Sequence, residues 1–238
     1  MAAVIRRLVL WDVDGTLVRA GDIGGAVFDR ALEAALGKPP TGRVRMSGKT
    51  DPQIVREYLD LMEIEEVDGL VDGVLRRIEE LLSAAASSGE LAAGGEALPG
   101  TAEVLERLAA DERVVSSLLT GNIAANALLK VAAFGLERWL DFEVGAYGSD
   151  HADRNLLVPV ALSRLKSARG VELGPGDVWV VGDTPRDLDC ARAAGSRCLL
   201  VGTGRYSAGD LALLGADAVV GDLSDTAGVV ELLAADLA

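Results

Sequence analysis

The hydrophobic positions change their spacing twice along this chain of 238 residues. Short apolar runs typical of buried strands occur at residues 5–11 and again from residue 114 onward, where they alternate with helical spacing. Between them, residues 19–96 repeat apolar side chains at helical spacing only. The pattern therefore predicts an α/β unit that a helical segment interrupts after its first strand.

The second half of the chain repeats the order of strand and helix. The expected strands lie at residues 114–119, 142–145, 178–181, 198–201 and 218–220, with helices between them. Such alternation favours a parallel sheet with right-handed crossovers. We expect an α/β fold, a Rossmann-like doubly wound parallel sheet formed by residues 1–18 and 97–238, with residues 19–96 as an inserted helical cap domain. The Ala-, Ser- and Gly-rich stretch 83–97 resembles a linker.

Polar side chains follow three of the expected strands. They are Asp12 and Asp14, Thr120 and Asn122, and Asp183 and Asp187. Because the carboxyl ends of parallel strands share one edge of the sheet, these side chains are expected to meet there. Charges at the end of a buried strand cost folding free energy unless they are paired or hold a metal. The sequence thus predicts a divalent cation beside a nucleophilic carboxylate.

The same residues carry a family resemblance. Residues 12–17 (DVDGTL), 119–122 (LTGN) and 182–187 (GDTPRD) resemble the first, second and fourth motifs of the haloacid dehalogenase-like (HAD) superfamily of hydrolases. The helical insertion resembles the first cap type of that family. Within it, residues 47–51 (SGKTD) resemble the substrate-facing loop of phosphoglycolate-phosphatase-like members. The resemblance covers the α/β core from end to end and implies phosphoryl transfer.

Phosphoryl transfer assigns a separate role to each acid. Asp12 is the expected nucleophile that carries the aspartyl-phosphate. Asp14 is expected to protonate the leaving alcohol and later to activate water. Asp183 would complete an oxygen site for Mg²⁺ with Asp12 and the backbone carbonyl of Asp14. Asp187 suits support of the metal or the base from a second layer, with a helix-dipole or salt-bridge role as the alternative.

The stretch 120–122 is expected to bind phosphate. The Thr120 hydroxyl and the amides of Gly121 and Asn122, at the start of a helix, can donate to phosphate oxygens. The alternative is that Thr120 and Asn122 form an ordinary helix N-cap.

One position departs from the family pattern. The family usually places a lysine at the start of the helix before the fourth motif, whereas residues 150–155 (DHADRN) contain none. Lys166 lies about three turns further along that helix. We hypothesise that Arg154 substitutes, because arginine keeps the charge and offers a planar fork to phosphate. The alternative is that Arg154 is a surface residue.

The cap segment contains a local excess of positive charge. Arg43, Arg45 and Lys49 are three bases with no acid among residues 43–50. Lys49, alone or with Arg43 or Arg45, is expected to contact a charged leaving group when the cap closes, and the alternative is an exposed polar loop. Asp51 followed by Pro52 predicts a helix start with Asp51 as N-cap. Glycines near the two crossings, at 21, 24 and 25 and at 94–95, are candidate hinges.

Composition narrows the partners. The chain has 37 acidic and 23 basic side chains, a formal net charge of −14, so its surface should repel nucleic acids and anionic membranes. No apolar run reaches the roughly 18 residues that a membrane span needs, and no signal-peptide pattern is present. We therefore expect a cytoplasmic protein that binds a small anionic phosphorylated metabolite. The sequence does not predict an oligomeric state.

The leading functional hypothesis is a Mg²⁺-dependent phosphatase that hydrolyses a small phosphomonoester. A phosphomutase of the same fold is an alternative, because it would share every core residue. A non-catalytic phosphate-binding family member is the second alternative, since the usual lysine is missing. A dehalogenase is disfavoured because that chemistry does not use a second acid such as Asp14.

Overall fold

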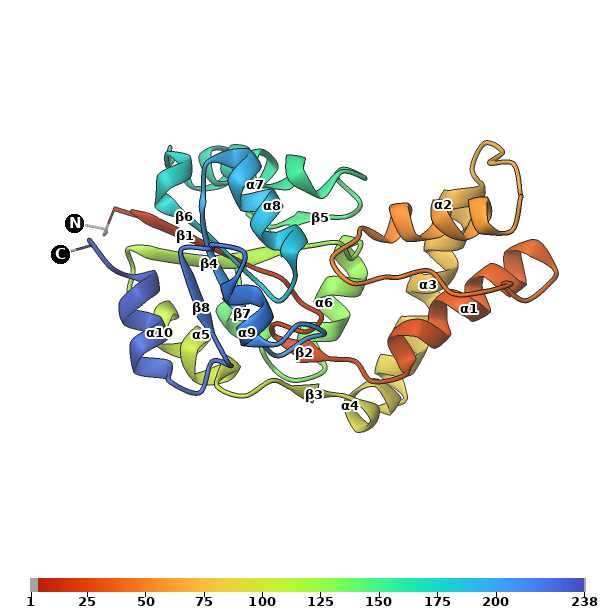
Figure 1. The fold of residues 1–238 in the computed structure, drawn as a ribbon, viewed down its shortest axis with the longest axis horizontal. Coiled ribbons are helices and arrows are strands. Elements are labelled where there is room, and N and C mark those ends of the chain that lie inside the picture. The colour runs from red at the N-terminus through yellow and green to blue at the C-terminus, as the bar shows by residue number, and fades with distance from the viewer. Residues whose placement is uncertain (1–3, 238) are drawn as a thin grey trace.

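The computed structural model describes residues 4–237, and a six-stranded sheet of order β5-β4-β1-β6-β7-β8 forms its centre (Figure 1). The strands are β1 (Arg7–Trp11), β4 (Val114–Thr120), β5 (Ala146–Tyr147), β6 (Val178–Gly182), β7 (Arg197–Val201) and β8 (Ala218–Val220). Every pair in this sheet is parallel. The predicted parallel α/β fold is confirmed.

Helices cover both faces of the sheet. Because side chains alternate along a strand, Val9 and Trp11 of β1 face one layer and Leu8 and Leu10 face the other. The first layer consists of α5 (Thr101–Ala109), α6 (Ala124–Ala132) and α10 (Thr226–Leu233). The second consists of α7 (Leu157–Arg169), α8 (Pro185–Ala194) and α9 (Ala208–Ala212). Short 3₁₀ turns lie at η1 (Glu137–Trp139), η2 (Arg154–Leu156) and η3 (Pro175–Asp177).

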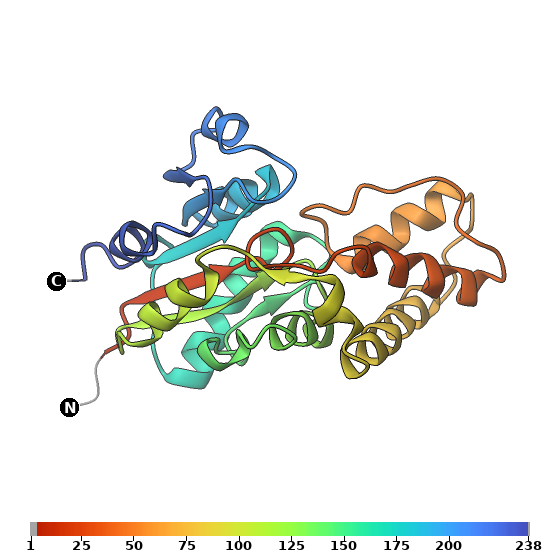
Figure 2. The same cartoon turned by 90° about the horizontal axis from the view of Figure 1, so that it is seen from below.

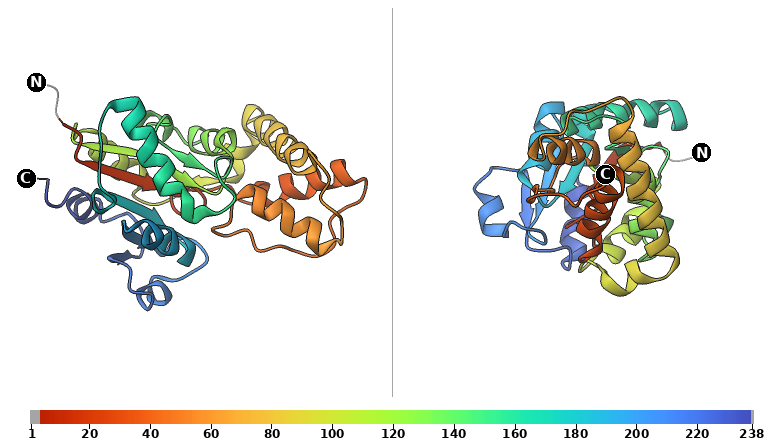
Figure 3. Two further views of the ribbon diagram at one scale, coloured as in Figure 1. Left: turned by 90° about the horizontal axis from the view of Figure 1, so that it is seen from above. Right: turned by 90° about the vertical axis from the view of Figure 1, so that its right-hand side faces the viewer.

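β1 lies at the point where the chain changes direction across the sheet. Its neighbours are β4 on one side and β6 on the other. Ligands of open α/β sheets bind beside the carboxyl ends of strands at such a switch point. In Figure 3 (left) the arrow of β1 points toward the helices of residues 23–94, so this edge of the sheet faces the cap segment.

The cap segment, residues 19–96, is helical as expected. Its helices are α1 (Ile23–Leu36), α2 (Asp51–Leu61), α3 (Leu70–Ser87) and α4 (Glu90–Gly94), which lie beyond one end of the sheet (Figure 2). They share an apolar cluster that includes Phe28, Ile54, Tyr58 and Leu82. That residues 19–96 form a domain of their own stays a proposal.

Two local predictions were wrong. The stretch 83–97 is no linker, because α3 continues to Ser87 and α4 follows, which fits the high helix propensity of alanine and the burial of Leu91. The strand expected at residues 142–145 is instead β5, Ala146–Tyr147. Residues 142–144, just before β5, form a turn, which is held beside β4 by a hydrogen bond from the amide of Asp141 to the carbonyl oxygen of Ser116.

The two crossings between core and cap segment lie side by side. β2 (Val18–Arg19) and β3 (Glu96–Ala97) form an antiparallel pair. A Cβ atom on Gly21, which has a φ of +61°, would lie 2.2 Å from the carbonyl oxygen of Gly94. Close backbone approach therefore requires glycine here, and a hinge role stays a prediction. Among residues 4–237, no helix has both the length and the apolar character needed to cross a membrane.

Candidate active site

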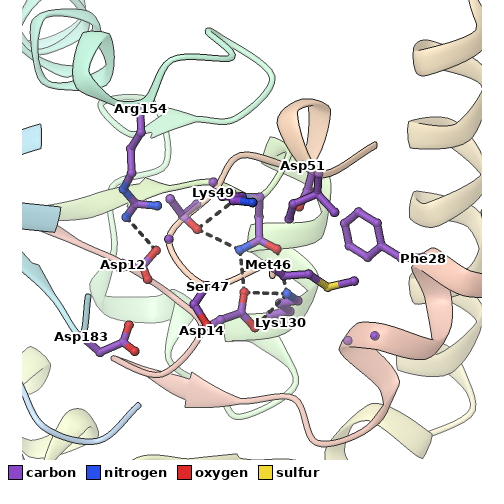
Figure 4. A pocket seen from close by; sticks show the side chains of 17 residues that line it. Asp12, Asp14, Phe28, Met46, Ser47, Lys49, Asp51, Lys130, Arg154 and Asp183 are labelled. Carbon is purple, nitrogen blue, oxygen red and sulfur yellow. Dashed lines mark hydrogen bonds and ion pairs between the residues drawn. The ribbon is translucent and has the colours of Figure 1, made fainter. Parts of the chain in front are cut away.

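One cavity of about 220 Å³ lies between the carboxyl edge of the sheet and the cap segment (Figure 4). The sequence-predicted residues that line it are Asp12, Asp14, Lys49, Thr120, Gly121, Asn122, Arg154 and Asp183. Asp187 is fully buried behind the lining. The structure thus brings all three strand ends to a single site.

Arg154 is a buried residue of this site. It lies in η2 and is 5% exposed, so the alternative of a surface arginine was wrong. Its Nη2 atom lies 3.0 Å from Oδ1 of Asp12 and donates to Oδ1 of Asp187 at 2.6 Å. It also donates to the carbonyl oxygen of Leu119 at 3.1 Å. Arg154 therefore links the first and fourth motifs across the sheet edge.

Burial and charge act in opposite directions on this pair. Burial opposes the charge of Arg154, but Asp187 and Asp12 raise the pKa of its guanidinium above the ordinary value. Burial raises the pKa of Asp12 to about 6, and Arg154 limits the rise. Further positive charge beside this carboxylate would lower its pKa again and favour the ionised form.

Asp183 pairs with no basic side chain among residues 4–237. It is 3% exposed, and its Oδ1 atom has no hydrogen-bond partner in the described part of the chain. Burial, followed by the charges of Asp12 and Asp187, raises the pKa of Asp183 to about 8. Backbone surrounds its carboxylate, since a Cβ on Gly15 or Gly204 would lie 2.7 Å or 1.6 Å from Oδ2. A buried, unpaired carboxylate oxygen in a close-fitting site is suited to bind a cation.

The oxygen atoms at this edge fit Mg²⁺. Carboxylate oxygens of Asp12, Asp183 and Asp187 lie within 4.8 Å of one another. Oδ1 of Asp187 accepts from Arg154, and its Oδ2 accepts from the amide and hydroxyl of Thr184 at 2.9 and 2.7 Å. Asp12 and Asp183 therefore offer the available oxygens, and hard oxygen donors are those that Mg²⁺ prefers.

Thr120 is the last residue of β4, and Gly121 and Asn122 form a loop before α6 rather than a helix cap. α6 begins at Ala124 with Ile123 in the N-cap position, so the N-cap alternative for Thr120 and Asn122 was wrong. Oγ1 of Thr120 accepts from the Asn122 amide at 3.3 Å and from its Nδ2 at 2.8 Å. The Thr120 hydroxyl hydrogen remains available to donate to an anion in the cavity.

The sequence analysis missed Lys130. This residue of α6 donates from Nζ to both carboxylate oxygens of Asp14, at 2.8 and 2.7 Å, and to Oδ1 of Asn122 at 2.7 Å. The sequence did contain a signal for this residue, because Lys130 is a single charge on the buried face of a helix, beside Ala127 and Val131. Asn122 also donates from Nδ2 to Oδ2 of Asp14 at 2.8 Å.

The sequence analysis also misjudged Asp51. The N-cap of α2 is Thr50, whose Oγ1 accepts from the amide of Gln53. The buried Asp51 instead accepts from the amide of Ile123 at 2.9 Å, so its carboxylate binds the N-terminal end of α6. Burial raises the pKa of Asp51 to about 6, and Lys130 limits the rise.

Hydrogen bonds to backbone carbonyl oxygens of the core hold the cap loop, residues 46–51, against it. The amide of Asp51 donates to the carbonyl oxygen of Gly121 at 2.7 Å, and the Thr50 hydroxyl donates to that of Ala152 at 2.8 Å. The approach is close enough that a Cβ on Gly121 would lie 1.9 Å from the carbonyl oxygen of Lys49. The cavity is therefore seen with its cap loop seated.

The three bases of the cap segment are not equivalent. Lys49 lines the cavity, and its ammonium group pairs with Glu57 of α2. Arg43 pairs with Asp29 at 2.6 Å on the surface, and neither Arg43 nor Arg45 lines the cavity. A leaving-group contact through Lys49 stays a proposal, and it would require that Lys49 exchange Glu57 for the substrate.

Comparisons with known proteins agree with this geometry. The HAD-hydrolase-like family model matches residues 156–226. Phosphoglycolate phosphatase 1 of Pseudomonas aeruginosa is 32% identical over 207 residues, which cover 83% of this chain and 70% of that protein.

Solved structures share the fold. A hydrolase from Pseudomonas syringae has a TM-score of 0.70 at 19% identity, covering 95% of this chain and 98% of its own. CbbY from Rhodobacter sphaeroides, in complex with phosphate, has a TM-score of 0.68 at 19% identity, covering 93% and 96%. With the motif residues gathered at one cavity, these similarities establish that the chain is a hydrolase of the haloacid dehalogenase-like family.

Proposed function

We propose that this hydrolase is a Mg²⁺-dependent phosphatase that cleaves a small phosphomonoester through an aspartyl-phosphate on Asp12. One observation carries the proposal. Asp12 contacts Arg154 on one side, and on the other it lies near Asp183, whose Oδ1 atom has no hydrogen-bond partner among the described residues. Supporting it, the relative from P. aeruginosa is named a phosphoglycolate phosphatase, and the R. sphaeroides structure contains phosphate.

Each part of the site has a task in the first half of the reaction. Oδ2 of Asp12 is the proposed attacking oxygen, because Oδ1 contacts Arg154. As the Asp12–phosphorus bond forms, the phosphorus–oxygen bond to the leaving group breaks, and Asp14 gives that oxygen its proton. Arg154 and the Thr120 hydroxyl bind equatorial phosphate oxygens and stabilise their charge in the transition state.

The second half returns the enzyme to its starting state. Asp14, now a carboxylate, takes a proton from water while the hydroxyl attacks phosphorus and the Asp12–phosphorus bond breaks. The products are phosphate, ionised Asp12 and protonated Asp14. When bound by Asp12, Asp183 and the backbone carbonyl of Asp14, Mg²⁺ would supply the charge that prevents repulsion between carboxylate and phosphate. Asp187 holds Arg154 in place from behind.

The cavity restricts the leaving group. Its cap side is lined by Gly24, Phe28, Met46 and Ile54, and its total volume is about 220 Å³. A small metabolite such as phosphoglycolate or a short sugar phosphate is therefore proposed. A negatively charged leaving group would take Lys49 as its partner.

The test is a phosphate-release screen over a panel of phosphorylated metabolites with Mg²⁺, using Asp12→Asn as the control. Release that requires both Mg²⁺ and Asp12 is the expected result. Interconversion of hexose phosphates without net release would instead favour a phosphomutase. Absence of release from every substrate by the folded protein would favour a non-catalytic phosphate-binding protein.

A further inference from the structure

Lys130 is a buried charge without an assigned role. Its side chain is only 9% exposed, whereas the Asp14 side chain with which it pairs is 44% exposed. The ammonium group has three hydrogens, and three acceptor oxygens surround it, two from Asp14 and one from Asn122. A lysine that is desolvated and fully satisfied is fixed in position, and α6 anchors it to the sheet through Ala127 and Val131.

The contacts of Asp14 leave one acceptor position available. Its two oxygens together offer about four. Lys130 and Asn122 occupy both positions on Oδ2, and Lys130 occupies one on Oδ1. Among residues 4–237 these contacts leave one position, on Oδ1. In Figure 4 the carboxylate of Asp14 points toward Lys130, on the side of Met46 and Phe28, where the leaving group would lie.

We infer that Lys130 is a positioning residue, which holds Asp14 so that Oδ1 carries the proton exchanged with the leaving oxygen and with water. The inference rests on the proposed function of Asp14. The Oδ1 proton passes to the leaving oxygen as its bond to phosphorus breaks, and Oδ1 takes a proton from water when the aspartyl-phosphate is hydrolysed. Without Lys130 only the Asn122 amide would hold the half-exposed carboxylate, and Oδ1 would lose its fixed position, so proton transfer would fail in both halves while attack by Asp12 continued.

Two substrates separate these halves. An alkyl phosphate has a poor leaving group and needs Asp14 in the first half. Nitrophenyl phosphate has a good leaving group and needs Asp14 only in the second half, when water is activated. Loss of proton transfer should therefore produce slow turnover of the alkyl phosphate and a burst of nitrophenolate from nitrophenyl phosphate.

The experiment compares Lys130→Met with Asp14→Asn, and uses Lys166→Met, an exposed lysine paired with Glu172, as the matched control. We expect Lys130→Met to lower kcat for the alkyl phosphate by about 100-fold, at the lower end of what a general acid contributes. With nitrophenyl phosphate it should give a burst of close to one nitrophenolate per active site. Lys166→Met should behave as the unsubstituted protein. Lys130→Gln allows the same comparison if Lys130→Met does not fold.

A double substitution makes the test stricter. If Lys130 acts through Asp14, adding Lys130→Met to Asp14→Asn should lower kcat by less than about twofold more. Equal losses on both substrates without a burst, or multiplicative losses in the double variant, would overturn the inference. A burst in Asp14→Asn but not in Lys130→Met would overturn the role of Lys130 and leave the proposed role of Asp14 intact. Absence of a burst in Asp14→Asn would overturn the proposed role of Asp14, and the inference with it.

Discussion

The Nη2 atom of Arg154 lies 3.0 Å from Oδ1 of Asp12, the proposed nucleophile. The same nitrogen also donates to Asp187 and to the carbonyl oxygen of Leu119. One nitrogen therefore makes all three contacts, as a lysine ammonium group could. This geometry supports the proposal that Arg154 takes the role of the lysine in the family pattern.

We predict that Arg154→Lys retains activity and that Arg154→Met does not. Lysine can place one charged nitrogen among the three acceptors, whereas methionine leaves Asp12 and Asp187 buried without a counter-charge. We expect kcat/KM to fall by less than about tenfold for Arg154→Lys and by more than about 100-fold for Arg154→Met, as for loss of one transition-state donor. Steady-state kinetics on the best substrate of the screen measure both.

A structural effect has to be separated from this catalytic one. Arg192→Met is the control, because Arg192 donates to backbone carbonyls on the surface, away from the cavity. It should leave kcat/KM unchanged. If Arg154→Met retained the activity of the unsubstituted protein, the assignment of Arg154 would be abandoned.

The strand ends were predictable from the sequence, whereas the support of Asp14 was not. Asp12 and Asp183 directly follow a strand and Thr120 ends one, and parallel strands bring their carboxyl ends to one edge. Lys130 reaches Asp14 across 116 positions, and only the packing of α6 against the sheet determines that meeting.

The cap segment shows the same division. Its helical spacing predicted the helices α1–α3, but it did not predict which residues of the loop before α2 would contact the core. The Asp51 carboxylate could accept a hydrogen bond from an amide of its own helix, α2, or from an amide of another helix. In the folded chain it accepts from Ile123, at the N-terminal end of α6. Local propensity cannot distinguish these outcomes, because the two backbone amides are equivalent donors.

We predict that Asp183→Asn abolishes stabilisation by Mg²⁺. The unsubstituted protein should gain about 2.7 kcal/mol in free energy of unfolding when Mg²⁺ is 100-fold above its dissociation constant. The asparagine variant should gain little, because a neutral amide replaces a ligand charge. In EDTA the Asp183→Asn variant should have a higher free energy of unfolding than the unsubstituted protein, because the substitution removes a buried carboxylate without a partner.

Urea denaturation with and without Mg²⁺ checks both parts of this prediction. Asp222→Asn, at a partly exposed acid outside the cavity lining, should respond to Mg²⁺ as the unsubstituted protein does. Equal Mg²⁺ stabilisation of Asp183→Asn and the unsubstituted protein would contradict the metal assignment.

We predict that Asp51 makes stability depend on pH. Burial raises its pKa from 3.8 to about 6, so the folded state binds more protons than the unfolded state between these values. Its contribution is fully present below about pH 4 and is lost as the pH rises through 6. Relative to Asp51→Asn, the unsubstituted protein should therefore lose at most about 3 kcal/mol in free energy of unfolding over this window.

Urea denaturation at several pH values between 4 and 8 gives the difference between the two proteins. Asp68→Asn, at an exposed acid, should show no such pH-dependent difference. A constant difference between Asp51→Asn and the unsubstituted protein across the range would show that Asp51 ionises normally. Lys130 and Asp14 are the charged groups that act on Asp51 from the core.

We predict that Lys49 matters only for substrates with a second anionic group. Lys49→Ala should raise KM for phosphoglycolate about tenfold, equivalent to ~1.4 kcal/mol, and leave KM unchanged for an alkyl phosphate whose leaving group is uncharged. Glu57→Gln should lower KM for phosphoglycolate, because it frees the ammonium group from its partner. Lys38→Ala, at an exposed residue, serves as the control. Identical substrate profiles for Lys49→Ala and the unsubstituted protein would rule out this contact.

We predict that Gly121→Ala impairs seating of the cap loop. The added methyl group would lie 1.9 Å from the carbonyl oxygen of Lys49, so the loop must move away and lose the hydrogen bond between Asp51 and Gly121. Loss of this bond and of the neighbouring one to Ile123 costs about 2 kcal/mol, which lowers kcat/KM about 30-fold.

The matched control is Gly73→Ala in α3, where an added Cβ has no neighbour within 4 Å among the described residues. It should raise the free energy of unfolding by about 0.5–1 kcal/mol and leave kcat/KM unchanged, because alanine stabilises a helix interior relative to glycine. Thermal unfolding of both variants separates loss of folding from loss of seating. Normal kcat/KM in Gly121→Ala would show that turnover does not need the seated loop, since a methyl group at that position leaves no room for it.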